Sequence, residues 1–268
     1  MLNVRPPAVA GLFYPGVPDV LRHDVRAMLN EATHHDMVPK AIVAPHAGYV
    51  YSGPIAAAAY ALLQPVADRI RRVVLLGPAH RVWVDGLALP EADAFDTPLG
   101  RIEIDAAAAP SLLELPYVER NATTHAMEHS LEVQLPFLQS VLPAFKLVPL
   151  VVGGASPDQV AHVLDILWGG DETLIVVSSD LSHYLPYATA QQIDRATVDA
   201  ILNMDSHLAG EQACGAGPIN GLIRAAARRG LSPHLLDLRN SGDTAGDRQR
   251  VVGYAALAFT EDRPDARQ

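Results

Sequence analysis

The sequence is poor in several residue types, and each shortage excludes a class of protein. Only one of the 268 residues is a cysteine, Cys214, so a disulfide within the chain is excluded and a reducing compartment is favoured. No run approaches the ~18 apolar residues of a membrane span, and the first residues lack the long apolar region of a signal peptide. We therefore expect a cytoplasmic protein that does not enter a membrane.

Positive charge is also scarce. The chain has 20 Lys and Arg residues against 30 Asp and Glu residues, which gives a formal net charge of -10, and only Lys40 and Lys146 are lysines. Proteins that bind the phosphate backbone need a basic face, so nucleic acid is excluded as a partner. Hydrophobic residues make up 49% and charged residues 19%, a composition typical of a folded globular chain.

No Pro-, Gly- or Ser-rich linker divides the chain. The length therefore predicts a single domain over residues 1–260, followed by a polar C-terminal tail over 261–268. The segment from Arg5 to Pro15 mixes prolines with apolar residues, so we expect it to be extended rather than helical.

Three apolar runs, each suited to a buried strand, end in an imidazole or a carboxylate. They are Ala41–Ala44 before His46, Val73–Leu76 before His80, and Leu174–Val177 before Asp180 and His183. Open α/β sheets bind ligands outside the carboxyl ends of their strands, so we expect these side chains to share one site. Strands that alternate with helical segments predict an α/β fold with a mixed, largely parallel central sheet and helices on both faces.

The apolar spacing also predicts most of the helices. We expect helices over 19–33 with Asp19 as N-cap, 53–63, 123–142 with a kink at Pro136, 157–168, 186–204, and from Cys214 to Arg229. Short extended runs within 82–105 predict strands or a hairpin inserted beside the main sheet, and 235–238 and 251–259 read as the last strands.

His46 and His80 are the first two candidate metal ligands. Neutral imidazoles at rigid strand ends suit zinc, copper or iron, whereas a lone histidine in such a place often only completes a turn. Cys214 opens a helix, where the helix dipole favours a thiolate, so it is a candidate soft ligand or nucleophile. The alternative is a small buried hydrophobic residue. Two imidazoles and a thiolate leave coordination positions open, which suits a redox or Lewis-acid metal better than a closed zinc site.

Asp180 and His183 are candidate catalytic residues. They could form an acid/base pair in which the carboxylate orients the imidazole, or supply a further metal position. Alternatively, Asp180 caps a following helix and His183 lies at the surface.

Residues 125–129 match the H-x-x-E-H pattern of inverted zinc peptidases, but cap-type residues and Pro136 flank the match, so chance explains it better. Glu128 and His129 stay candidates for lining the site.

Together, these motifs resemble the Memo family, also described as the B component of the AmmeMemoRadiSam system. The matching stretches follow one another along nearly the whole chain: Ala8–Tyr14, Ala44–Tyr49, Leu76–His80, Glu128–Glu132, Ser178–His183 and Cys214-Gly215. The resemblance implies a fold similar to class III extradiol dioxygenases, which hold non-haem iron with two histidines and a glutamate. It also implies a metal site of His46, His80 and Cys214, with Asp180 and His183 in the same pocket.

The resemblance implies iron or copper as the metal, with zinc a third candidate, and a dioxygenase-like oxidoreductase acting on an unknown small substrate. Ring cleavage is not carried over, because Cys214 replaces the dioxygenases' glutamate, and Arg81 stands where many family members have a second histidine. The alternative function is a non-catalytic module that binds a peptide or protein in the same cleft. The system's name implies partnership with a radical SAM protein and an AMMECR-type protein.

Overall fold

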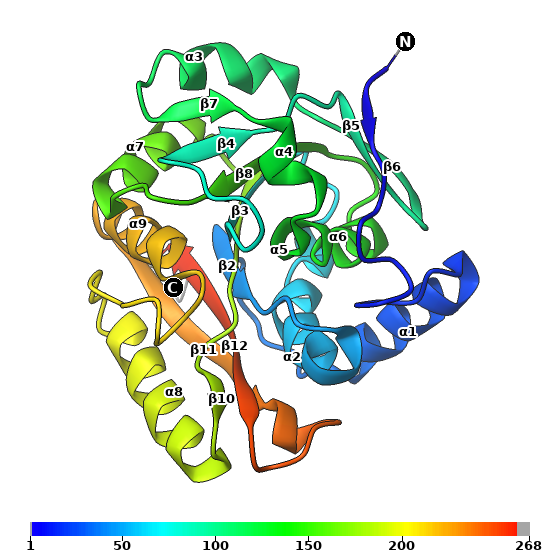
Figure 1. Ribbon diagram of the computed structural model, residues 1–268, viewed down its shortest axis with the longest axis vertical. Coiled ribbons are helices and arrows are strands. Elements are labelled where there is room, and N and C mark those ends of the chain that lie inside the picture. Colours follow the sequence, from blue (N-terminus) through cyan, green and yellow to red (C-terminus); the bar gives the residue numbers. More distant parts are fainter. Residues whose placement is uncertain (1, 262–268) are drawn as a thin grey trace, which may run out of the picture.

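The computed structural model describes residues 2–261, and the predicted tail falls outside it except for Glu261, which ends the last strand. A nine-stranded sheet crosses the molecule in the order β10-β12-β2-β9-β3-β8-β4-β7, with β11 paired to β12 (Figure 1). Its strands are β2 (Ala41–Ala44), β3 (Arg72–Pro78), β4 (Leu87–Leu89), β7 (Val118–Arg120), β8 (Lys146–Val152), β9 (Thr173–Ser178), β10 (His183–Leu185), β11 (Leu231–Asn240) and β12 (Val251–Glu261).

The four central strands of this sheet are parallel, and the strand that adjoins them on each side runs antiparallel to them. β2, β9, β3 and β8 run parallel to one another, whereas β12 is antiparallel to β2 and β4 is antiparallel to β8. The central strands are apolar along almost their full length because helices cover both faces. The predicted mixed, largely parallel α/β sheet is confirmed.

Two layers of helices enclose the sheet (Figure 1). The helices are α1 (Pro18–Glu31), α2 (Tyr49–Ala61), α3 (Ala109–Leu113), α4 (Ala122–Ala126), α5 (His129–Glu132), α6 (Leu135–Val141), α7 (Pro157–Leu167), α8 (Tyr187–Leu202) and α9 (Ala216–Ala227), with 3₁₀ turns at Gln64–Val66, Ala106–Ala108 and Ser241–Asp243. One hydrophobic core packs α1, α2 and α6 against the first face, and a second core packs α7, α8 and α9 against the other. Burial of apolar surface on both faces stabilises the layered arrangement.

A small second sheet joins the N-terminal segment to an inserted hairpin. It contains β1 (Val4–Arg5), β5 (Ala94–Thr97) and β6 (Gly100–Glu103), with β1 parallel to β5 and β5 antiparallel to β6. The hairpin predicted within 82–105 is therefore present, although β4 from the same stretch belongs to the main sheet.

The single helix predicted over 123–142 is wrong. The segment forms α4, α5 and α6, because Glu128 has an extended backbone and its side chain accepts a hydrogen bond from Ser130 N, which starts a new helix. Pro136 lies in the first turn of α6, where its missing N–H costs nothing, so it produces no kink. The predicted cap at Asp19 is also wrong, because Val17 occupies the N-cap position and Pro18 begins α1.

Helix α2 begins at Tyr49, four residues before the predicted start at Gly53. Gly53 serves close packing instead, since a Cβ there would lie 2.5 Å from the sulfur of Met28 on α1. The stretch after Asp180 also differs from one reading of the sequence: strand β10 follows it rather than a helix.

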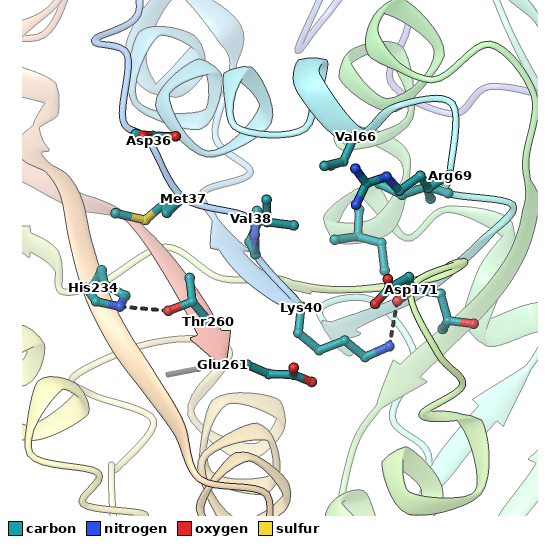
Figure 2. A pocket seen from close by; sticks show the side chains of 14 residues that line it. Asp36, Met37, Val38, Lys40, Val66, Arg69, Asp171, His234, Thr260 and Glu261 are labelled. Carbon is teal, nitrogen blue, oxygen red and sulfur yellow. Dashed lines mark hydrogen bonds between the residues drawn. The ribbon is translucent and has the colours of Figure 1, made fainter. Parts of the chain in front are cut away.

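A cavity lies at the amino ends of the parallel strands. His46 and His80 follow the carboxyl ends of the same strands, at the opposite edge of the sheet. This cavity has a volume of about 430 Å³, and Lys40 extends along it immediately before β2 (Figure 2). The Lys40 ammonium donates to the carbonyl oxygens of Trp168, Gly170 and Thr173 at 2.6, 2.7 and 2.7 Å. Lys40 therefore ties the start of β2 to the loop that leads into β9.

Replacing Lys40 with methionine is expected to lower the free energy of unfolding by about 2 kcal/mol, because three carbonyls lose a charged donor. Urea denaturation at neutral pH measures the change. Lys146→Met is the matched control, since Lys146 is exposed and makes no side-chain hydrogen bond within residues 2–261. Equal stabilities of the two variants would show that the Lys40 contacts contribute nothing.

Candidate metal centre

The three strand ends singled out by the sequence meet because β2, β9 and β3 are neighbours in the sheet. His46, Asp180 and His80 each follow their strand by two residues. The rings of His46 and His80 have their centroids 5.1 Å apart, and the Asp180 Oδ1 accepts a hydrogen bond from His46 N at 2.8 Å. Long-range strand pairing has therefore gathered residues that are more than 130 positions apart.

A third histidine completes the cluster. One ring nitrogen from each of His46, His80 and His129 lies within 4.8 Å of the other two. His129 begins the short helix α5 rather than following a strand, so the strand-end pattern missed it as a ligand. Its only sequence signal was its place in the 125–129 motif, beside Glu128.

In two of these imidazoles, His46 and His80, a neighbouring side chain lies within hydrogen-bond distance of Nδ1. His46 Nδ1 lies 2.8 Å from Ser178 Oγ, and His80 Nδ1 lies 3.0 Å from Glu128 Oε1. Glu128 Oε2 also accepts from the His80 backbone N–H at 2.6 Å. With each Nδ1 occupied in this way, the Nε2 atoms of His46 and His80 are left to act as ligands.

Burial keeps the imidazoles of His46 and His129 neutral, and hydrogen bonds keep Glu128 charged. Burial, followed by the neighbouring histidines, lowers the pKa of His46 well below its ordinary value. Burial likewise lowers the pKa of His129 to about 4, and Arg81, exposed beside His80, acts in the same direction. Burial alone would raise the pKa of Glu128, but hydrogen bonds from His80 and Ser130 outweigh it and bring that pKa to about 2.

A neutral imidazole has one ring nitrogen with a free lone pair. In one of the three rings, a buried nitrogen has no hydrogen-bond partner among the described residues. His129 Nδ1 is buried, makes no hydrogen bond with any described residue and lies 3.4 Å from Glu128 Oε1. Three lone pairs beside a buried carboxylate are what a bound cation requires. The cluster therefore fits a metal ion on its own geometry.

Cys214 lies next to the cluster. Its Sγ is 3.4 Å from His46 Nε2 and accepts a hydrogen bond from Asp180 N at 3.3 Å. Burial, followed by the charge of Asp180, raises the pKa of Cys214 to about 12, so the chain's own groups do not favour the thiolate predicted from the helix start. Helix α9 begins two residues later, and its dipole does not outweigh burial. That Cys214 is a metal ligand stays a prediction.

Asp180 and His183 both lie at the site, but not as the predicted pair. Burial raises the pKa of Asp180 to about 7, against hydrogen bonds from the backbone of His46 and Ala47. His183 is half-buried on β10, where burial lowers its pKa. No hydrogen bond joins the two side chains in the described part of the chain, so Asp180 does not orient His183. Their catalytic roles stay predictions.

The H-x-x-E-H match does not form a zinc-peptidase helix. His125 belongs to α4, and Glu128 and His129 belong to the start of α5, so the three residues do not share one helical face. His125 Nε2 instead lies 2.8 Å from the carbonyl oxygen of Ala88. The reading of this match as chance agrees with the geometry.

Within residues 2–261, none of the helices combines the length and the apolar character needed to cross a lipid bilayer.

Comparisons with known proteins find similar sequences and a similar fold. A family model described as "Memo-like protein" matches residues 5–258. A MEMO1 family protein of Methanosarcina barkeri is 36% identical, covering 95% of this chain and 99% of its own length, and one of Archaeoglobus fulgidus is 38% identical, covering 96% and 99%. An uncharacterized protein from Escherichia coli K12 matches in structure with a TM-score of 0.52 and 13% identity, over 81% of this chain and 98% of its own. The last match shows similarity of fold alone.

Proposed function

This chain belongs to the Memo-like protein family, and on that premise we propose that it binds a redox-active ion, iron or copper, and uses it to oxidise a small substrate. His46, His80 and Cys214 would hold the ion, and His129 would complete the cluster. The observation that carries the proposal is the set of three ring nitrogens within 4.8 Å of one another, with Cys214 Sγ 3.4 Å from His46 Nε2.

The donor set suits these metals. Two ligands of one tetrahedral ion, a nitrogen at ~2.0 Å and a sulfur at ~2.3 Å, lie roughly 3.5 Å apart, close to the contact between His46 and Cys214. Imidazole with thiolate is a set that copper, iron and zinc all accept. When bound, the ion supplies Lewis acidity or electron transfer to a substrate at an open position.

The protein's own groups position the ligands and handle protons. Ser178 and Glu128 fix the rings of His46 and His80, so that neither ring must be reordered when a ligand binds. Asp180, with its pKa near 7, takes up or releases a proton at neutral pH, which is the range in which an acid/base group is most effective. His183 lines the same cavity as His80 and Cys214, and burial lowers its pKa.

The test combines metal analysis with oxygen consumption. Protein purified without oxygen is expected to carry iron or copper near one equivalent and to consume oxygen when a reductant is supplied. Asp180→Asn should retain the metal and lose most of the oxygen consumption, whereas Asp199→Asn, an exposed carboxylate on α8, should change neither. Stoichiometric zinc without oxygen consumption would contradict the redox assignment.

A peptide- or protein-binding cleft is the second candidate function. Trp83, three residues after His80, is 69% exposed, and Tyr184, next to His183, is 63% exposed. Large exposed aromatic side chains are typical anchors of protein contacts. A radical SAM protein and an AMMECR-type protein are the partners to test. Loss of partner capture in Trp83→Ala or Tyr184→Ala, together with no oxygen consumption by the wild type, would favour this function.

Replacing Glu128 with alanine is expected to weaken metal binding by roughly 10- to 100-fold, because His80 loses the carboxylate that holds its ring and backbone. Competition against a chromophoric chelator, with zinc as a redox-silent probe, measures the affinity. Glu114→Ala is the control, since Glu114 is exposed and makes no side-chain hydrogen bond among the described residues. Unchanged affinity in Glu128→Ala would remove Glu128 from the site.

A further inference from the structure

A cavity of about 890 Å³ opens beside two of the proposed metal ligands, His80 and Cys214. The lining also includes the apolar side chains of Leu185 on β10 and of Ile193 and Ala196 on α8. Ile193 and Ala196 are three residues apart, so they lie on the same face of the helix. A molecule in this cavity would therefore have both hydrocarbon and the candidate metal centre within its lining.

Among the amino-acid side chains that line the cavity, the fixed charge has one sign. Glu211 is the only carboxylate among the lining residues, and none of them is a lysine or an arginine. Glu211 is exposed and forms no ion pair with a described basic residue. Arg81 follows His80 in the sequence but does not line the cavity. The carboxylate of Glu211 and the formal net charge of -10 on the whole chain both favour a cationic ligand over an anionic one.

We propose that this cavity takes a small amphipathic amine as the substrate of the metal centre. Its hydrocarbon body lies on Leu185, Ile193 and Ala196, its ammonium group lies near Glu211, and its remaining end faces His80 and Cys214. This inference rests on the proposed function, because it assigns the cavity as the substrate-binding site of the proposed metal centre. Apolar walls that bury a ligand with one charged group to fix its orientation are the usual design of small-molecule sites.

Three probes of similar size and different charge test the preference. They are 2-phenylethylamine, 2-phenylethanol and phenylacetate, titrated into the folded protein at neutral pH and followed by ligand-observed NMR. The amine is expected to bind at least about threefold more tightly than the alcohol, and the acid more weakly than both, as a partly exposed charge pair implies. Equal binding of all three probes, tighter binding of the acid, or binding of none would overturn the proposal.

Two kinds of variant place the binding in this cavity. Glu211→Gln should remove the preference for the amine, and Glu211→Lys should reverse it in favour of the acid. Glu31→Gln, an exposed carboxylate on α1, is the control and should leave the order unchanged. Ala196→Trp should fill the cavity and weaken all three probes together, and because Ala196 is exposed on α8 the fold should tolerate the larger side chain. Thermal melting checks the fold, and Ile193→Asp offers a second disruption of the apolar wall.

Running the titrations with metal-free and zinc-loaded protein separates this inference from the function on which it rests. Amine-selective binding that depends on Glu211 and Ala196 supports the cavity assignment even if no metal binds. Tight metal binding with no charge preference among the probes supports the metal centre and contradicts the amine.

Discussion

Replacing His46 with alanine is expected to weaken binding of a divalent ion by at least about 100-fold, more than the loss of a supporting residue such as Glu128 would. The reason is geometric: a ring nitrogen of His46 lies within 4.8 Å of one on each of His80 and His129, and its Nε2 lies 3.4 Å from Cys214 Sγ. Chelator competition measures the affinity. His23→Ala, an exposed histidine on α1, is the control. A tenfold or smaller loss in His46→Ala would place the ion elsewhere.

The pH dependence of the same affinity shows whether Cys214 is a ligand. Its pKa of about 12 means that the thiol keeps its proton between pH 6 and 8, so binding as a thiolate releases that proton. Affinity should then rise about tenfold for each pH unit, because one proton leaves for each ion bound. His46 and His129 add no such slope, since both are already neutral in this range. Cys214→Ala should flatten the profile, and a flat profile in the wild type would leave the three imidazoles as the ligand set.

Replacing Glu132 with alanine is expected to lower the free energy of unfolding by about 3–5 kcal/mol, the cost of leaving a buried charge without its partner. Glu132 is fully buried and pairs with Arg5 at 2.8 Å. Its carboxylate also accepts from the backbone N–H groups of Ala8 and Val9 and from the hydroxyl of Tyr14. The substitution therefore breaks the contacts that hold the N-terminal segment to α5.

Urea denaturation of Glu132→Ala, with Glu114→Ala as the exposed control, measures this effect. A double variant, Arg5→Met with Glu132→Leu, removes both charges and should recover much of the loss. Metal affinity provides a second measurement, because Arg5 also donates to the carbonyl oxygens of His125 and Glu128 and so holds the backbone that carries His129. A loss below about 1 kcal/mol in Glu132→Ala would show that the buried pair contributes little beyond a surface pair.

The broken helix over 123–142 illustrates where local pattern fails. Leu131, Leu135 and Leu138 have helical spacing, and the spacing alone cannot reveal that Glu128 turns away to bind His80. The carboxylate gains two hydrogen bonds from a residue 48 positions earlier in the chain, and the helix is interrupted there. His129 was missed as a candidate ligand for the same reason, since its position depends on that interruption.

The sequence by itself determined the α/β class, the buried strands and the histidines at their ends, because burial on both faces of a sheet leaves apolar runs that are visible locally. Only the tertiary structure decided that β9 lies between β2 and β3, that His129 joins His46 and His80, and that Cys214 is buried deeply enough to keep its proton. These features depend on which distant segments pack against one another and on how completely that packing buries a side chain from water. Neither the packing partners nor the degree of burial is set by the residues adjacent in the chain.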